Sequence, residues 1–309
     1  QTFTNNGTVG NIDFMTFNDG NGPPVQFVQG IGTWLPTNIQ VGAGPSTTLN
    51  LGTNVNFTTN QLITASGAAI DVGNLTLTMS GPTNIFRGMI KGTGLVKMQP
   101  ASGTPNLGIP LTIDPAVRIV SGTVKSGGAT IKGNLTVDAG ATLSLLNFTG
   151  ITANGDLLNN GTINVFSGNP SIAFNGNTFT NNGSITGGVY VNFGTFFGPN
   201  LAQNLAGTGT WSGNPRLLVD AFSTTTLQSD VTYNGGNLFV AGRVNTGPFT
   251  LSLPCTVLWS GAGEVVGNLR RTNLAACPGV PIAFGNPYTT IQFTSGTAPS
   301  EISVQVLSG

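Results

Sequence analysis

The side chains that could carry out chemistry in this chain are few and widely spaced. Among its 309 residues there are ten Asp and Glu, ten Lys and Arg, two Cys and no His. Without histidine, neither a Ser-His-Asp nor a Cys-His arrangement can form, and no imidazole can bind a metal. Two cysteines alone cannot complete a four-ligand zinc site. We therefore predict no metal site and no cofactor.

Paired carboxylates would be the remaining route to catalysis, as in glycosidases. Asp138 and Asp156, 18 residues apart, could lie together in neighbouring turns of a repeat, as could Asp71 and a more distant partner. Such pairs arise by chance in any repeat. The glycine-rich stretches GIGTW and GTGTWSG lack the Lys-Ser/Thr of a phosphate-binding loop. We predict no catalytic residues, and thus a protein that is not an enzyme.

The cations are less evenly distributed than the acids. Six of the ten fall within one stretch: Arg87, Lys91, Lys97, Arg118, Lys125 and Lys132. If they shared one face they could contact an acidic polysaccharide, and otherwise they form an ordinary solvated surface. The net charge is zero, which gives no electrostatic footprint for nucleic acid.

The two cysteines lie close together near the end of the chain. We predict a disulfide between Cys255 and Cys277, as in an oxidising compartment, although two unrelated buried thiols would fit the sequence too. The sequence begins at Gln1 without a signal peptide, which fits a mature exported protein or an arbitrary boundary. No apolar run approaches the roughly 18–20 residues that span a bilayer. We expect an extracellular or cell-surface location.

Apolar and polar residues alternate with a period of two along most of the chain. GNLTLTMSG puts Leu75, Leu77 and Met79 on one face, and SEISVQVLSG does the same near the C-terminus. Amphipathic helical patterns with capping signals are absent. The chain is predicted to be all β. Its core is expected to include several large aromatic residues, namely Trp34, Phe148, Phe166, Phe174, Phe179 and Trp211. The alternative for the two tryptophans is an exposed position, where they could stack on sugar rings.

Short phrases recur along the chain at intervals typical of solenoid repeats. NNG occurs at 5–7, 159–161 and 181–183, and GNLT occurs at 73–76 and 133–136, which fits three turns of the repeat. Gly and Asn adopt the left-handed backbone angles of sharp corners at little cost. The recurrence predicts a right-handed parallel β-solenoid (β-helix) over residues 1–250, with about eleven coils of about 22 residues. Antiparallel hairpins are the alternative, because Asn-Gly also favours two-residue turns.

Stretches such as GNLTVDAGATLSL and LLNNGTINV resemble the β-solenoid regions of secreted bacterial surface proteins, including adhesins and autotransporter passengers. Residues 251–309 are predicted to form a small disulfide-linked β-rich module. Within it, 261–306 resembles a module near the C-terminal ends of many secreted bacterial repeat proteins, which carries a G-x-L-x-R strand. The turn IAFGNPY lacks the Pro-Val that is usual there. The resemblance implies a structural or sorting role.

These observations predict an extracellular structural or adhesive protein that assembles head-to-tail with copies of itself into a filament. Residues beyond the given sequence could instead cap the ends of the solenoid. The alternative function is a polysaccharide-binding or polysaccharide-cleaving β-helix, so the expected partners are the protein itself and a cell-surface or matrix polysaccharide. The strands expected to mediate assembly contain Thr2, Phe3, Thr4 and Val9 at one end and Ile302, Val304 and Val306 at the other.

Overall fold

The structure is a computed structural model that describes residues 2–10, 12–17, 25–42, 47–64, 67–82, 84–86, 88–108, 111–146, 150–194, 201–294 and 296–307. These residues form β-strands and one short 3₁₀ helix, η1 (Leu274–Ala276). The chain divides into two compact units. The first comprises residues 1–155 and 166–170, and the second comprises 156–165 and 171–309.

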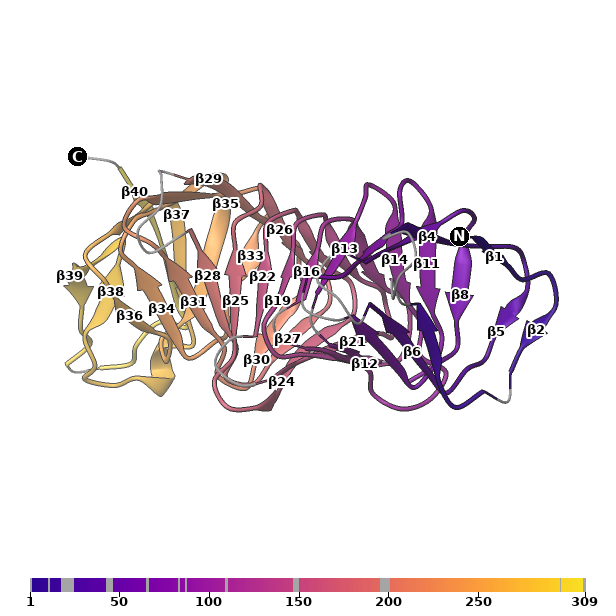
Figure 1. Ribbon diagram of the computed structural model, residues 1–309. Helices are drawn as coiled ribbons and strands as arrows, with labels where there is room; N and C mark the ends of the chain where they lie inside the picture. The colour runs from indigo at the N-terminus through magenta and orange to yellow at the C-terminus, as the bar shows by residue number, and fades with distance from the viewer. Residues whose placement is uncertain are drawn as a thin grey trace. The chain divides into compact units, whose positions relative to one another are not determined.

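The first unit consists of coils of three short strands, one strand in each of three parallel sheets (Figure 1). Sheet A contains β1 (Thr2–Thr4), β4 (Val25–Gln29), β7 (Thr48–Leu51), β10 (Ala69–Asp71), β13 (Met89–Lys91), β16 (Leu111–Ile113), β19 (Ala129–Ile131) and β22 (Ile151–Ala153). Sheet B contains β2 (Thr8–Val9), β5 (Thr33–Trp34), β8 (Val55–Phe57), β11 (Thr76–Met79), β14 (Leu95–Met98), β17 (Ala116–Ile119) and β20 (Leu135–Val137). Sheet C contains β3 (Met15–Phe17), β6 (Asn38–Val41), β9 (Gln61–Thr64), β12 (Asn84–Phe86), β15 (Asn106–Leu107), β18 (Thr123–Ser126) and β21 (Thr142–Leu146).

The second unit is built in the same way, with longer strands toward its C-terminus. Its sheet A contains β25 (Ser171–Phe174), β28 (Tyr190–Phe193), β31 (Arg216–Val219), β34 (Asn237–Val240) and β36 (Leu258–Ser260). Its sheet B contains β23 (Leu157–Asn159), β26 (Thr178–Asn181), β29 (Leu201–Ala206), β32 (Ser223–Leu227), β33 (Val231–Thr232), β35 (Arg243–Pro254), β37 (Glu264–Thr272) and β40 (Glu301–Val306). Its sheet C contains β24 (Thr162–Ser167), β27 (Ser184–Thr186) and β30 (Thr210–Ser212). A separate hairpin pairs β38 (Ile282–Phe284) with β39 (Asn286–Ile291).

The predicted all-β fold, a parallel β-solenoid of about eleven coils followed by a small antiparallel module, is confirmed. Coil length is less regular than predicted. The coil that leads from Ile113 to its register partner Ile131 is much shorter than the coil that leads from Val191 to Leu217. The two GNLT phrases lie three coils apart, before β11 and β20, as their spacing predicted. β35 runs across residue 250, and the last parallel strand, β37, ends at Thr272.

The NNG phrases form corners between successive strands. Asn159 and Asn181 are buried at the same corner of adjacent coils, and the Asn159 Nδ2 donates to Asn181 Oδ1 at 2.8 Å. In the next coil the same corner is formed by Gly207-Thr208-Gly209. A glycine is needed at its first position, because a Cβ at Gly207 would lie 2.1 Å from the Asn181 carbonyl oxygen. The G-x-G phrase here therefore occupies the corner that NNG forms in the preceding coil.

Inward-facing side chains of the three sheets fill each coil. In the first unit these are mostly aliphatic residues such as Leu77 and Leu135, which are fully buried. In the second unit, rings of Phe174, Phe179 and Trp211 lie 5.5–6.2 Å apart along the core. Trp34 is also buried, as expected, and Phe148 lies outside the described residues.

The prediction that Phe166 lies in the core is wrong. Phe166 is 58% exposed, and the Lys125 Nζ lies 3.6 Å above its ring. Ile163 points inward from β24, so Phe166, three positions further along, points outward by the alternation of a strand.

Candidate functional site

The first coil has an uncovered end within the described part of the chain. β1, β2 and β3 pair with β4, β5 and β6 on one side, and none of them pairs with a described strand on the other. Three of the predicted assembly residues, Thr2, Phe3 and Thr4, form β1, and Val9 lies on β2. Their backbone groups on the free side can pair with another strand.

The uncovered coil exposes apolar side chains that occupy core positions in later coils. Phe3 is paired with Val28, which is fully buried, yet Phe3 itself is 42% exposed. Its ring packs on Trp34 with 5.4 Å between the centroids. A hollow of about 290 Å³ opens beside Phe3, Met15 and Phe17. Phe27, which also lines it, is exposed as well. Further apolar side chains of the first two coils are exposed, namely Ile12, Phe14, Val25 and Leu35.

At the C-terminal side of the second unit, β40 covers the edge of β37 with an antiparallel pairing. The predicted residues Ile302, Val304 and Val306 all lie on β40 and are half-buried. Ile302 is opposite Arg271 and Val304 is opposite Leu269, so these side chains pack onto the module. The other backbone edge of β40 pairs with no described strand and can therefore bind a partner strand.

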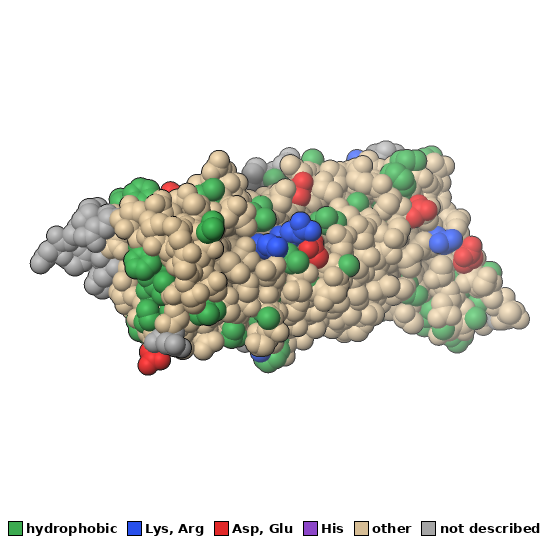
Figure 2. Space-filling view, turned by 90° about the vertical axis from the view of Figure 1, so that its right-hand side faces the viewer, with side chains coloured by type: hydrophobic (Ala, Val, Ile, Leu, Met, Phe, Trp, Pro, Cys, Tyr) green, Lys and Arg blue, Asp and Glu red, His purple; other side chains and the backbone are tan. Residues whose placement is uncertain are grey.

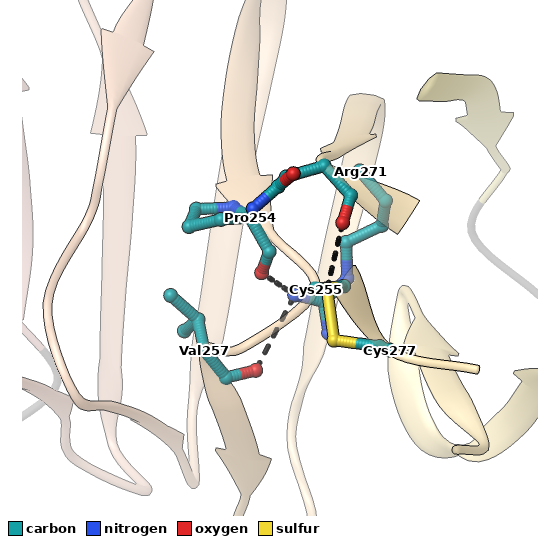
Figure 3. Close-up of a disulfide and its surroundings, with 6 residues drawn as sticks. Pro254, Cys255, Val257, Arg271 and Cys277 are labelled. Atoms are coloured by element: carbon teal, nitrogen blue, oxygen red, sulfur yellow. Dashed lines mark hydrogen bonds between the residues drawn. A yellow bond between two sulfur atoms is a disulfide. The ribbon is translucent and has the colours of Figure 1, made fainter. Parts of the chain in front are cut away.

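Cys255 and Cys277 are joined by a disulfide, as the sequence predicted, with 6.2 Å between their Cα atoms. The bond closes a segment that contains β36, β37 and η1. Both cysteines are buried beside the Arg271 side chain (Figure 3). The disulfide thus fastens the last coil to the antiparallel module.

Arg271, the arginine of the G-x-L-x-R strand, is a buried cation held by backbone carbonyls. Its Nε donates to the Ala283 oxygen at 3.0 Å. Its Nη1 donates to the oxygens of Pro254 at 3.1 Å and Val257 at 3.4 Å (Figure 3). Burial lowers the pKa of Arg271 to about 10. The side chain joins β35, the disulfide-closed segment and the hairpin, which is a structural role. The sequence motif marked this residue, but not its burial.

A second hollow, of about 390 Å³, lies on the second unit. Phe222, which is 56% exposed, lines this hollow, and so does an ion pair of Arg243 and Glu264 with 3.2 Å between Nε and Oε1. Ala241 and Gly242 also line it. Sequence reasoning missed this site, because it depends on the relative lengths of two corners.

The six clustered cations do not share one face of the solenoid, so they do not form the common basic surface on which contact with an acidic polysaccharide would depend. Lys91 lies in sheet A, Lys97 and Arg118 lie in sheet B, and Lys125 lies in sheet C. Arg87 falls outside the described residues. On the face shown in Figure 2, charged side chains form a few small groups on a largely uncharged surface.

The acids have local partners rather than forming one cluster. Asp138 pairs with Arg118 at 2.9 Å, and Asp156 accepts backbone N–H groups of Asn177 and Thr178. Among the described residues, no three or more His, Cys, Asp or Glu side chains lie close enough together to hold a metal ion. Asp220 is buried, and its Oδ2 has no hydrogen-bond partner in the described part of the chain. This burial raises the pKa of the carboxyl.

Comparisons with protein-family models, curated proteins and solved structures give no match to this chain. None of the described helical residues forms a helix long and apolar enough to cross a membrane. The functional argument therefore depends on the two hollows, the free strand edges and the disulfide.

Proposed function

We propose that this chain is an extracellular structural protein that assembles with copies of itself through the uncovered end of its first coil. The observation that carries the proposal is the exposure of Phe3 at a position that is core in the next coil. A strand of another copy paired with β1 would bury Phe3, cover part of the hollow beside it, and complete the free backbone hydrogen bonds of β1.

A second copy is the favoured occupant because this chain also carries a free strand edge elsewhere, on β40. Joining different surfaces of two copies is a heterologous contact, which propagates into a filament when it does not close into a ring. The chain has ten cationic and ten acidic residues, so copies gain no net repulsion as they associate. The disulfide supports an extracellular setting, since such bonds persist in oxidising compartments.

Sedimentation velocity over a concentration series, with negative-stain microscopy, tests the proposal. The wild-type chain should form a concentration-dependent series of linear oligomers. Phe3→Asp places a charge on the uncovered end and should leave monomers. Ile31→Asp is the matched control, because Ile31 is 92% exposed on the corner between β4 and β5 and should not affect assembly. A wild-type chain that stays monomeric at high concentration would refute the proposal. So would equal assembly of the two variants.

A further inference from the structure

The hollow on the second unit results from two corners of different length in adjacent coils. Val219 pairs with Val240, and Thr224 pairs with Arg243. The first coil places Asp220 to Ser223 between these positions, whereas the second places only Ala241 and Gly242. The longer corner carries the exposed side chain of Phe222, and residues of both corners line the hollow.

The backbones of the two corners pack closely together at Gly242, which lines the hollow. A Cβ at Gly242 would lie 2.1 Å from the Asp220 oxygen and 2.2 Å from the Ser223 oxygen, so only glycine allows the two corners to approach this closely. Ala202 and Ala241 add only methyl groups to the lining. The volume of about 390 Å³ is within the range of small-molecule sites, about 300–1,000 Å³.

The ion pair of Arg243 and Glu264 also has hydrogen-bonding groups that its own contact does not use. Arg243 and Glu264 are register partners on β35 and β37, and their side chains are 41% and 42% exposed. Within the described residues, the two side chains meet through Nε and Oε1. The remaining guanidinium N–H groups can donate, and the second carboxylate oxygen can accept.

This combination matches the chemistry of a sugar ring. A pyranose presents C–H groups on one face, which pack against the electron-rich face of an aromatic ring, and pairs of neighbouring hydroxyls at its edge. Each hydroxyl can accept a hydrogen bond from the arginine and donate one to the carboxylate. Because Arg243 and Glu264 balance in charge, an anionic sugar would gain at one and be repelled by the other.

We propose that the hollow lined by Phe222 and the Arg243–Glu264 pair binds a neutral pyranose unit of a polysaccharide. Phe222 stacks on the ring, and the ion pair hydrogen-bonds adjacent hydroxyls. The inference does not depend on self-assembly, because the hollow lies within the second unit and uses neither β1 nor the free edge of β40.

Isothermal titration calorimetry of the full chain with cellohexaose, maltohexaose, a linear galactan oligosaccharide and hexagalacturonate tests this proposal. At least one neutral oligosaccharide should bind. Phe222→Ala and Glu264→Gln should each weaken that binding about tenfold, as expected for losing a stacked ring or a charged hydrogen-bond partner. Both sites are partly exposed, so the unfolding temperature should not change. Tyr288→Ala is the matched control, because Tyr288 is an exposed aromatic outside the hollow.

Three results would overturn the proposal. The first is no binding of any neutral oligosaccharide. The second is binding that Phe222→Ala and Glu264→Gln leave unchanged. The third is a preference for hexagalacturonate, which would show that the cation acts alone. Sedimentation of the same samples shows whether assembly persists, so failure here is separate from failure of the proposed assembly.

Discussion

Removing the disulfide should loosen the end of the second unit and little else. The bond between Cys255 and Cys277 closes a loop with a sequence separation of 22. Loop-closure entropy for this length is worth about 3 kcal/mol. The double variant Cys255→Ser and Cys277→Ser should therefore lower the opening free energy of β36, β37 and the hairpin by about that amount.

Hydrogen exchange measured by mass spectrometry reads this change locally, which matters because coils of a solenoid need not unfold together. A loss of about 3 kcal/mol corresponds to exchange about a hundredfold faster in β37 and β40. Peptides from β11, in the first unit, should exchange at the wild-type rate. If β37 and β40 keep their wild-type protection in the double variant, the disulfide does not fasten this module and the reasoning is wrong.

Three further substitutions probe buried polar groups. Asn181→Ala removes hydrogen bonds to Asn159 and to the Thr210 carbonyl and should cost about 2 kcal/mol in urea unfolding, whereas the exposed Asn182→Ala should cost under about 0.5 kcal/mol. Arg271→Met removes the hydrogen bonds of a buried guanidinium to three backbone carbonyls, so protection of β38 should fall by about 3 kcal/mol, and unchanged exchange would contradict the structural role of Arg271. Burial raises the pKa of Asp220 in the folded state, so its buried carboxylate destabilises the fold in full only at pH values above that pKa. Asp220→Asn should raise the unfolding temperature at pH 7, and the gain should shrink as the pH falls toward 3.8; an equal gain at both ends would contradict this.

The strands and their stacking could be predicted because they follow from local chemistry. Alternation places Leu77 and Met79 inward whatever the neighbouring coil contains, and both are buried. The Asn-Gly corners recur because every coil must turn sharply, and this recurrence gave the solenoid. The cysteine pair followed from residue type and proximity alone.

The remaining features depend on the register between coils, which the sequence does not state directly. Phe166 was expected in the core, but the strand alternation set by Ile163 places it outside. The cations seemed contiguous in sequence, yet successive coils distribute them over three sheets. The hollow beside Phe222 requires knowing that Val219 pairs with Val240, since only then does the difference in corner length become visible.

The burial of Arg271 could not be predicted from the sequence for a different reason. An arginine in an alternating strand is normally read as solvent-facing, because buried charges are costly. Its acceptors come from Pro254, Val257 and Ala283, which are distant in sequence and are brought together by the disulfide-closed segment and the hairpin. Carbonyls carry no side-chain signature, so this site could not be predicted.

The central claim, head-to-tail assembly through the first coil, is tested most directly by cross-linking two single-cysteine-addition variants. Thr4→Cys places a thiol on β1 and Ser303→Cys places one on β40, both at exposed positions. After mild oxidation, a mixture of the two should give mixed dimers, whereas Thr4→Cys alone should give none. Mixed dimers that Phe3→Asp abolishes are the predicted result. Dimers formed by Thr4→Cys alone, or no mixed dimers at concentrations where the chain is fully soluble, would contradict the account.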